Sequence, residues 1–546
     1  MRTLSLLELP SEIISQILSL LSRRDLTVCV RVNKAWCSAF MDSLWHMVES
    51  GKVDVINALY RRHLKSVNQS PFLRNLHRIR VLDVQHPTFL RLMYEQDPSP
   101  LEPIPLTQLS VRFCVAKSIL GPSTGPRHKI REFSDMDPIL QILGRSTQLV
   151  SFSFWAIIFI PDLHLARLLA TLSTSLEKLE MVTDPKYSPT KLASQQGAKA
   201  LDIFLEVRKD SRFDNLTKMS IIGDSIEPTL LVALLEHSPK MDELNLDRYH
   251  TECGDAALAR VISSVASQGW KTLGFRFMSD RIGPLTVAAI LQSCATLENL
   301  RLTNCVAFDS KSIQKLLCSA PNLRRFDSIS DNVRDEVEHY SLMAMDIVES
   351  TEDWVCLGLE TFKCYISGVP RPDITSKNNG RPLTGIYNSG SRYSMLESTR
   401  IQRRVLAQLG RLTKLRYVTL GNDTIDLQRV DGANMYEERM EGSYYSWETY
   451  EMGSQYQCLT MSLQDGLDEL RNLKSLRWLS LEKMSLRMGE AERAWMTDNW
   501  LEYGKGPRDT FWTSRGHHVD VGTDLFDKML HRYPGMLNDI HTYDWW

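Results

Sequence analysis

A short hydrophobic pattern recurs along most of this chain. It has the form apolar-x-x-apolar-x-apolar. Clear copies are LEKLEM from Leu176, LTKMSI from Leu216, MDELNL from Met241, WKTLGF from Trp270, LENLRL from Leu297, LETFKC from Leu359, LRYVTL from Leu415 and LRWLSL from Leu476. Between Leu216 and Leu323, successive copies begin 25, 29, 27 and 26 residues apart. A period of this length predicts stacked repeats rather than separate globular domains.

The segments between the copies have the pattern of helices. PTLLVALLEHSP precedes Met241, and PLTVAAILQSCA precedes Leu297. Pro228 and Pro284 stand where a first helical turn begins, a place where the missing N–H of proline costs nothing. Asp309 or Ser310 is a candidate cap for the next helix. Each unit is therefore expected to consist of a short strand, a turn, a helix and a return.

These units resemble the leucine-rich repeat family in its longer, cysteine-containing form. The segment L-x-x-L-x-L-x-x-C/N is complete from Leu297 to Cys305 and, with Val111 at one apolar place, from Leu106 to Cys114. The resemblance covers roughly residues 70 to 485. It implies an α/β fold, a curved solenoid with a parallel sheet on its concave face and helices outside.

The strand pattern also predicts which side chains line the concave face. Alternate residues of a strand point to opposite faces, so the Leu-type positions face the core and the intervening positions face outward. A mixed polar, charged and aromatic face suits recognition of a target protein, although a merely solvated sheet face remains an alternative. The candidate target-binding residues are Glu243, Asn245, Arg276, Asn299, Arg301, Arg325, Lys363, Tyr365, Tyr417 and Trp478.

The first 50 residues have a different pattern of apolar residues, without the repeat. Ile13, Ile14, Ile17 and Leu18 recur at helical spacing. Ser11, Asp25 and Asn33 are candidate caps for three successive helices. Three helices in about 40 residues cannot bury all this apolar surface alone, because small domains are marginally stable. A partner is therefore expected.

The same stretch is similar to the F-box family. The family pattern begins with Leu9-Pro10-x-Glu12-Ile13, continues through Asp25-Leu26 and closes with Leu44-Trp45. The resemblance implies docking onto the small Skp adaptor, and through it onto a cullin. The docking positions carried over are Leu9, Pro10, Ile13, Ile14, Ile17, Leu18, Val30 and Trp36. A helical cap on the solenoid is the alternative interpretation.

The two resemblances together imply a substrate-recognition adaptor of an SCF-type cullin–RING ubiquitin ligase. Such an adaptor is not an enzyme. It raises the effective concentration of a target near the conjugating enzyme. The alternative is an F-box-bearing scaffold that acts outside ubiquitylation.

Composition and charge argue against some classes of partner. The net charge is −2, so no global basic excess indicates nucleic acid or an anionic membrane. The longest apolar run, from Phe154 to Ile160, is far shorter than the roughly 20 residues of a spanning helix. The scattered cysteines favour reduced thiols and hence a cytoplasmic or nuclear protein.

The expected organisation has three parts. A docking module over 1–50 is followed by the solenoid over 51–485 and a capping region over 486–546, where ERAWM and TDLFDKMLHRY are expected to be helical. Two insertions interrupt the solenoid, a basic one of net charge +5 at 366–404 and an acidic, tyrosine-rich one of net charge −6 at 421–457. Disorder, mutual pairing and partner binding all remain open for them.

Enzyme signatures are weak. GHHVD offers His517, His518 and Asp520, but without an H-E-x-x-H spacing, and no phosphate-binding P-loop occurs. We therefore expect no metal and no cofactor. An enzyme built on the solenoid would have to depend on the His517 region.

Overall fold

The computed structural model describes residues 10–49, 74–84, 102–113, 136–156, 160–183, 193–223, 226–247, 254–264, 269–276, 278, 282–303, 305, 308–329, 341–373, 393–421, 458–481, 484 and 486–500. It begins with three helices, α1 (Ser11–Leu20), α2 (Arg23–Cys29) and α3 (Lys34–His46). Helix α3 runs directly into the first strand, β1 (Met47–Glu49).

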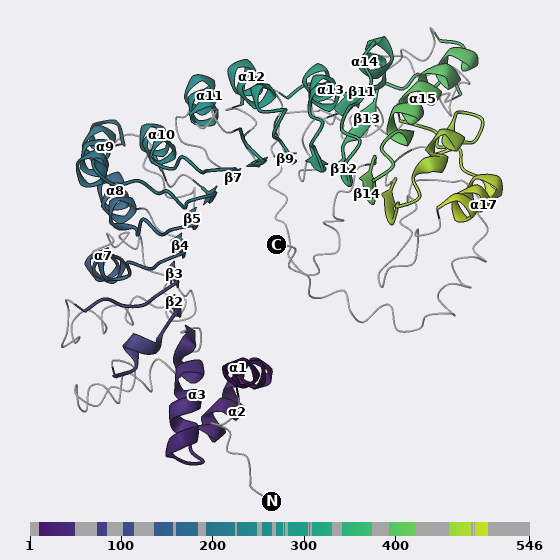
Figure 1. Cartoon of the computed structure of the whole chain (residues 1–546). Coiled ribbons are helices and arrows are strands. Elements are labelled where there is room, and N and C mark those ends of the chain that lie inside the picture. The colour runs from purple at the N-terminus through teal and green to yellow at the C-terminus, as the bar shows by residue number, and fades with distance from the viewer. Residues whose placement is uncertain are drawn as a thin grey trace, which may run out of the picture.

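The described strands form one long parallel sheet whose spatial order follows the chain (Figure 1). Every neighbouring pair is parallel and in register, as in β7 and β8, where Leu244 lies beside Leu273. After β1 its strands are β2 (Val81–Val84), β3 (Gln108–Phe113), β4 (Ser151–Ala156), β5 (Lys178–Thr183), β6 (Lys218–Ile222), β7 (Glu243–Asp247), β8 (Thr272–Arg276), β9 (Asn299–Thr303), β10 (Arg325–Asp327), β12 (Thr361–Lys363), β14 (Tyr417–Thr419) and β15 (Trp478–Ser480).

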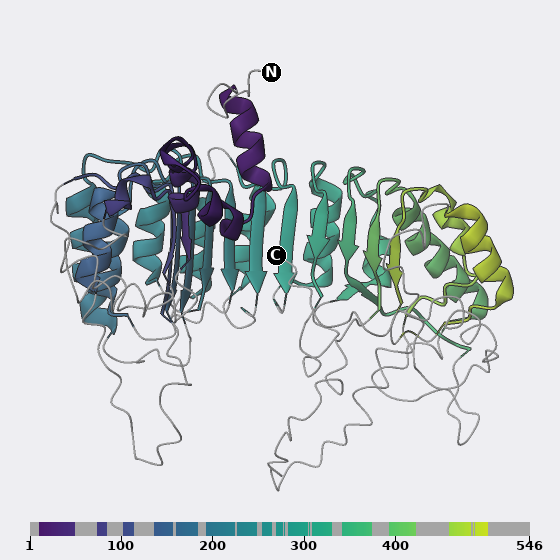
Figure 2. The ribbon, with the colours of Figure 1, turned by 90° about the horizontal axis from the view of Figure 1, so that it is seen from below.

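Helices cover the outer side of this sheet and leave its inner side open, so that the molecule is an arc that does not close (Figure 1). Seen from below, the strands stand side by side with the helices behind them (Figure 2). The helices are η3 (Leu76–Arg78), α7 (Met136–Arg145), α8 (Asp162–Thr171), α9 (Ala193–Arg208), α10 (Pro228–Glu236), α11 (Asp255–Ser263), α12 (Pro284–Gln292), α13 (Ser310–Ser319), α14 (Ala344–Glu349), α15 (Met395–Gly410), η8 (Leu467–Asn472) and α17 (Glu490–Asn499).

The core is one continuous apolar layer between sheet and helices. Leu-type strand positions such as Leu244, Leu300 and Phe326 are buried, whereas Glu243 and Asn245 on either side of Leu244 are only half-buried. The predicted α/β solenoid with a parallel sheet and outer helices is confirmed. Pro228 and Pro284 begin α10 and α12, as expected. Asp309 caps α13, because its carboxylate accepts from the backbone N–H of Ser312 at 2.9 Å.

The repeat regularity breaks after β10. Strands β11 (Ser341–Met343) and β13 (Tyr365–Ser367) pair in a separate two-stranded sheet. Within the stretch predicted as an insertion at 366–404, β13 occupies the beginning and α15 the end. Arg371 from this stretch is buried and forms two 2.9 Å hydrogen bonds with Asp373. Residues 374–392 and 422–457 lie outside the described residues.

The C-terminal end of the array is covered by α17, which confirms the helix expected over ERAWM. Trp500 after this helix is buried, and its indole N–H donates to the carbonyl oxygen of Leu470 at 3.1 Å. The helix expected over TDLFDKMLHRY and the His517 region fall among residues 501–546, outside the described part of the chain.

Candidate protein-binding surfaces

Side-chain caps fix where two of the three N-terminal helices, α2 and α3, begin. Ser22 precedes α2 and forms a capping box with Asp25: the hydroxyl of Ser22 accepts from Asp25 N at 3.3 Å, and Ser22 N donates to the carboxylate at 3.1 Å. The expectation that Asp25 itself is the cap is therefore wrong, as is that for Ser11, which is the first residue of α1 after Pro10. The cap expected at Asn33 is confirmed, with Trp36 N donating to it at 2.9 Å.

This module buries little of its apolar surface. Among residues 10–49, only Leu26, Phe40 and Val48 are buried hydrophobic residues. Trp36 stacks on Phe40 with the ring centroids 5.3 Å apart and remains half-buried.

Helix α1 is the least covered element of the module. Of its apolar side chains, Ile13 is 41% exposed and Leu20 is 85% exposed. Ile14, Ile17 and Leu18, like Val30 after α2, are only half-buried, and Pro10 is exposed. Leu9 lies outside the described residues. The docking positions that the structure describes on α1 thus form an apolar face that the other described residues leave open.

The module is joined to the array through the sheet itself. Strand β1 pairs in parallel with β2, with Met47 beside Val81. The N–H of Arg80 donates to the carbonyl oxygen of His46 at 2.9 Å. Arg78 also forms an ion pair with Asp42 of α3. Strand β1 therefore belongs both to the N-terminal module and to the sheet of the array.

The inner face of the arc holds nine of the ten predicted concave residues (Figure 1). Each of the nine stands at an exposed or half-buried strand position that alternates with core positions: Glu243 and Asn245 on β7, Arg276 on β8, Asn299 and Arg301 on β9, Arg325 on β10, Lys363 on β12, Tyr417 on β14 and Trp478 on β15.

Tyr365 is the exception and its prediction is wrong. It lies on β13, in the two-stranded sheet, and is 4% exposed. The main-sheet strand β12 ends at Lys363. Beyond that residue the alternation of the main sheet no longer applies, so counting two positions from Lys363 places Tyr365 on the wrong face.

The charges of the concave face change along the arc. Strands β2 to β7 carry four acidic and three basic side chains there, and Lys218 pairs with Glu243 at 3.0 Å. Strands β8 to β15 carry four basic side chains and one acidic one, Asp327, which lies 3.7 Å from Arg301 and 3.9 Å from Lys363. The C-terminal half of the face is therefore the more basic half.

A second row of charges runs along the edge where the strands begin. Each residue of this row precedes a strand, and its N–H donates to the carbonyl oxygen of the equivalent residue in the previous repeat at 2.7–3.1 Å. Lys271 donates to Asp242 at 2.8 Å, which raises the pKa of the lysine above its ordinary value. The charges alternate until the last member and are, in order, Asp242, Lys271, Glu298, Arg324, Glu360, Arg416 and Arg477.

Sequence reasoning missed this edge row. Its signal was present, because each member is the first x of an apolar-x-x-apolar-x-apolar copy, as Arg477 is in LRWLSL. Alternation alone assigned the second and third x of a copy, and the residue that follows the copy, to a binding face, but not the first x.

Comparison with known proteins bears on the N-terminal module. Residues 6–49 match the family model described as F-box-like. The chain thus carries an F-box-like module ahead of an array that has the parallel, in-register strand order expected of leucine-rich repeats. Comparison with curated proteins finds no match.

Two solved structures are similar in part to this chain. The leucine-rich repeat-containing protein LegL7 from Legionella pneumophila shares 11% identity over 69% of this chain and 90% of its own, with a TM-score of 0.29. The TLR13–ssRNA13 complex shares 13% identity over 74% of this chain and 59% of its own, with a TM-score of 0.22. The repeat architecture rests on the sheet order and register rather than on these scores.

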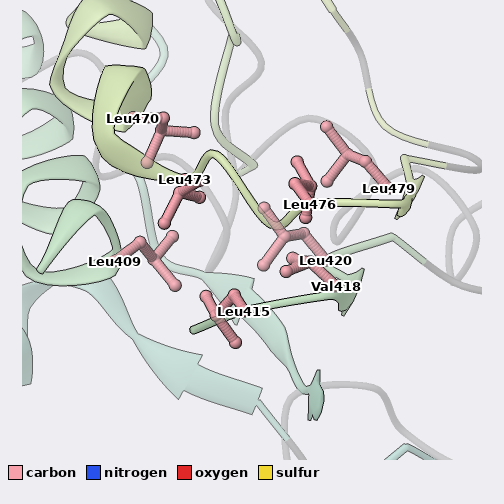
Figure 3. Close-up of a pocket in the computed structure, with 8 residues that line it drawn as sticks. All are labelled: Leu409, Leu415, Val418, Leu420, Leu470, Leu473, Leu476 and Leu479. Carbon is pink, nitrogen blue, oxygen red and sulfur yellow. The ribbon is translucent and has the colours of Figure 1, made fainter. Parts of the chain in front are cut away.

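One small gap among the described residues is part of the core packing. Leu409, Leu415, Val418, Leu420, Leu470, Leu473, Leu476 and Leu479 line it between α15, β14, η8 and β15 (Figure 3). Its volume is about 10 Å³, and its lining carries no polar side chain. A space of this size is too small for a ligand, and its apolar lining offers no group that would bind one. The exposed surfaces therefore remain the candidate sites.

The described residues contain neither a metal site nor a membrane-spanning helix. Within them, no group of histidine, cysteine and carboxylate side chains is arranged to hold a metal ion. No described helix is both long and apolar enough to cross a membrane.

Proposed function

We propose that this F-box protein is the substrate-recognition adaptor of an SCF-type cullin–RING ubiquitin ligase. In this proposal the exposed side of α1 binds the Skp adaptor, through which the chain reaches a cullin. The concave face binds a target protein. The cell compartments that fit this role are the cytoplasm and the nucleus.

The observation that carries the proposal is the uncovered apolar face of α1. Ile13 is 41% exposed, and Ile14 and Ile17 are half-buried, although all three are residues that favour the interior of a protein. A monomeric protein rarely leaves such a cluster open unless it marks an interaction site. The match of this stretch to the F-box-like family model supports an adaptor of the Skp type as the partner.

The mechanism is tethering. The array would hold a target while the N-terminal helices hold the ligase, and the transfer of ubiquitin would then proceed at high effective concentration. No side chain of this chain takes part in the bond-forming step, so the adaptor acts by position alone.

Co-purification with the Skp adaptor and a cullin tests the proposal. The double variant Ile13→Ala, Ile17→Ala removes apolar contact area from α1 while keeping good helix formers, so we expect at least a tenfold loss of Skp binding. Leu285→Ala is the control, because Leu285 is an exposed apolar residue on α12, away from the N-terminal helices. Undiminished binding of the double variant would contradict the docking assignment.

Target turnover separates the ligase role from the scaffold alternative. A ligase adaptor is expected to bind cullin as well as Skp, and its target is expected to accumulate when the Skp adaptor is depleted. Skp binding without cullin binding, together with unchanged target abundance, would instead favour an F-box-bearing scaffold outside ubiquitylation.

A further inference from the structure

Four neighbouring strands begin with an unusual set of residue pairs. In each pair the first residue precedes the strand and the second is its first residue; for β10, β12, β14 and β15 the pairs are Arg324-Arg325, Glu360-Thr361, Arg416-Tyr417 and Arg477-Trp478. The edge residues of these pairs are joined in order by backbone hydrogen bonds of 2.8 to 2.9 Å, and Tyr417 is in register with Trp478. We name Arg324, Arg325, Arg416, Tyr417, Arg477 and Trp478 the arginine–aromatic edge.

The aromatic pair of this edge is accessible. Tyr417 is 44% exposed, and Trp478 is half-buried. The next positions on the same face of β14 and β15, Thr419 and Ser480, are buried. The accessible part of these two strands is therefore their beginning, where the rings lie beside the arginines. Trp, Tyr and Arg are also the residues that most often dominate the energy of protein interfaces.

The positive charge of the edge is only partly neutralised. Arg324 lies 3.9 Å from Glu298, and Arg416 lies 3.7 Å from Glu360. Arg325 and Arg477 are exposed, and neither has an ion-pair partner among the residues that the structure describes. Deeper on the same face, Arg301 and Lys363 share the single carboxylate of Asp327. The surface around the two rings therefore attracts negative charge.

We propose that the arginine–aromatic edge binds an extended acidic segment of the target protein. An apolar or aromatic side chain of that segment packs on Tyr417 and Trp478, and its carboxylates pair with Arg325 and Arg477. This inference rests on the proposed function, because it assigns the target chemistry of the same concave face.

The geometry of the sheet sets the spacing of those carboxylates. Parallel strands lie about 4.8 Å apart, so the three steps from β10 to β15 span about 14 Å. An extended chain advances about 3.4 Å per residue, so two acidic residues about four positions apart reach Arg325 and Arg477 together. The anchor residue lies toward the second acid, because Tyr417 and Trp478 are on the last two strands.

A peptide fits this surface better than a single-stranded nucleic acid. Basic and aromatic residues also bind single strands, but Glu360 stands within the row of arginines and Asp327 lies between Arg301 and Lys363. A nucleic acid would bring a phosphate to each of these carboxylates. A peptide places uncharged residues there and carboxylates only where the arginines are unpaired.

Fluorescence anisotropy with the full-length protein tests the proposal. The probe is a labelled synthetic peptide with two glutamates four positions apart and a phenylalanine beside the second. The comparison probe replaces both glutamates with glutamine. We expect the acidic peptide to bind at least tenfold more tightly than its glutamine form, and its affinity to fall with rising salt. Equal binding of the two peptides would overturn the proposal.

Matched variants locate the binding site. Arg325→Gln combined with Arg477→Gln is expected to weaken the acidic peptide at least tenfold. Arg260→Gln, at an exposed arginine of α11 on the outer side, is expected to leave the affinity unchanged. Tyr417→Ala is expected to weaken binding, whereas Tyr417→Phe retains the ring and most of the affinity. Full affinity in the double arginine variant would overturn the proposal.

Other occupants give different outcomes. Tighter binding of an oligouridine than of the acidic peptide would overturn the proposal in favour of a nucleic acid. The chain's own acidic stretch at 421–457 is another candidate occupant. Peptide binding that appears only after this stretch is replaced by a Gly-Ser linker would assign the edge to that stretch instead of a target.

The peptide assay also separates this inference from the proposed function. It needs neither Skp nor cullin. If the protein binds Skp but not the acidic peptide, the inference alone is rejected. If it binds the peptide but not Skp, the ligase role alone is rejected.

Discussion

Asp255 of helix α11 accepts a hydrogen bond from the backbone N–H of Thr286, the third residue of helix α12, at 2.8 Å. The same carboxylate accepts from Gly283 N at 3.0 Å and from Leu285 N at 2.9 Å. The first turn of α12 is thus capped from the preceding repeat instead of by its own sequence. The consequence is that two neighbouring repeats share one capping group, so that their stabilities are coupled.

Removal of this shared cap is expected to be costly. Asp255→Ala leaves three N–H groups at a helix start without their acceptor, and we expect the free energy of unfolding to fall by about 2 kcal/mol. Urea denaturation followed by circular dichroism measures the change. Asp309→Ala is the control, because Asp309 caps its own helix through Ser312 N. We expect the control to lose about 1 kcal/mol, and a larger loss in the control would contradict the shared-cap interpretation.

Arg208 provides a second contact of this kind, at the other end of a helix. It lies at the end of α9, is 3% exposed and donates to the carbonyl oxygens of Leu169 and Leu172 at the C-terminus of α8. Its guanidinium carbon lies 4.1 Å from the ring centroid of Phe213. Burial lowers the pKa of Arg208 to about 10, so it stays charged near neutral pH.

Arg208→Met is expected to destabilise the protein by about 2 kcal/mol, because it leaves buried carbonyl groups without a charged donor. Arg208→Lys is expected to recover little of this loss, since an ammonium lacks the planar fork that stacks on Phe213 while donating to α8. Differential scanning calorimetry of the two variants checks the prediction. A melting temperature of the lysine variant equal to that of the unmodified protein would disprove it.

The C-terminal repeats depend on pH through Asp465. Burial raises the pKa of its carboxyl, but hydrogen bonds from Thr399, Ser462 and Thr460, each 2.7 Å long, and the nearby Arg487 outweigh this effect and hold the pKa below its ordinary value of 3.8. A carboxyl whose folded pKa is depressed stabilises the fold fully above its unfolded pKa. This stabilisation is lost as the pH falls through the folded pKa.

Asp465→Asn therefore removes part of the acid sensitivity of the protein. We expect the variant to be less stable than the unmodified protein near pH 7, and the difference to shrink as the pH falls below about 4. Melting temperatures measured across this range test the sign. A difference that instead widens on acidification would show that the carboxyl is not held ionised by its neighbours.

Thiol chemistry gives an independent test of the core. Burial raises the pKa of Cys294 to about 11 and those of Cys356 and Cys364 to about 12, despite smaller opposing effects from neighbouring groups. These buried thiols are therefore protonated at pH 8 and are expected to resist iodoacetamide in the native protein, because the thiolate is the reactive form. Mass spectrometry should find them unlabelled until the protein is denatured, and rapid native labelling of Cys356 would contradict its burial.

The repeat architecture could be predicted from the sequence because one apolar pattern sets strand, face and core together. The residues that escaped prediction are those whose position depends on a break in that pattern. Tyr365 changed faces because the chain leaves the main sheet after Lys363. The capping role expected of Asp25 fell to Ser22, since a capping box uses both residues and the sequence does not show which one begins the helix. The cap of α12 comes from Asp255, a contact between repeats that local reading cannot find.

The concave candidates on regular strands were placed correctly for the same reason that the edge row was missed. Alternation identifies side chains such as Arg325 that point away from the core. It says nothing of Arg416 or Arg477, which precede the strands and become neighbours only when the repeats stack in register.

Because α3 runs directly into β1, the array fixes the distance between the N-terminal helices and a molecule bound to a given strand. Because His46 and Met47 are consecutive and β1 is already a member of the sheet, no hinge of this chain separates the N-terminal helices from the strands. Each further strand displaces a bound molecule by about 4.8 Å and turns it along the arc. In the proposed ligase, the strand that a target contacts would thus decide how far its lysines lie from the conjugating enzyme. The number of strands in the array would set the largest such distance.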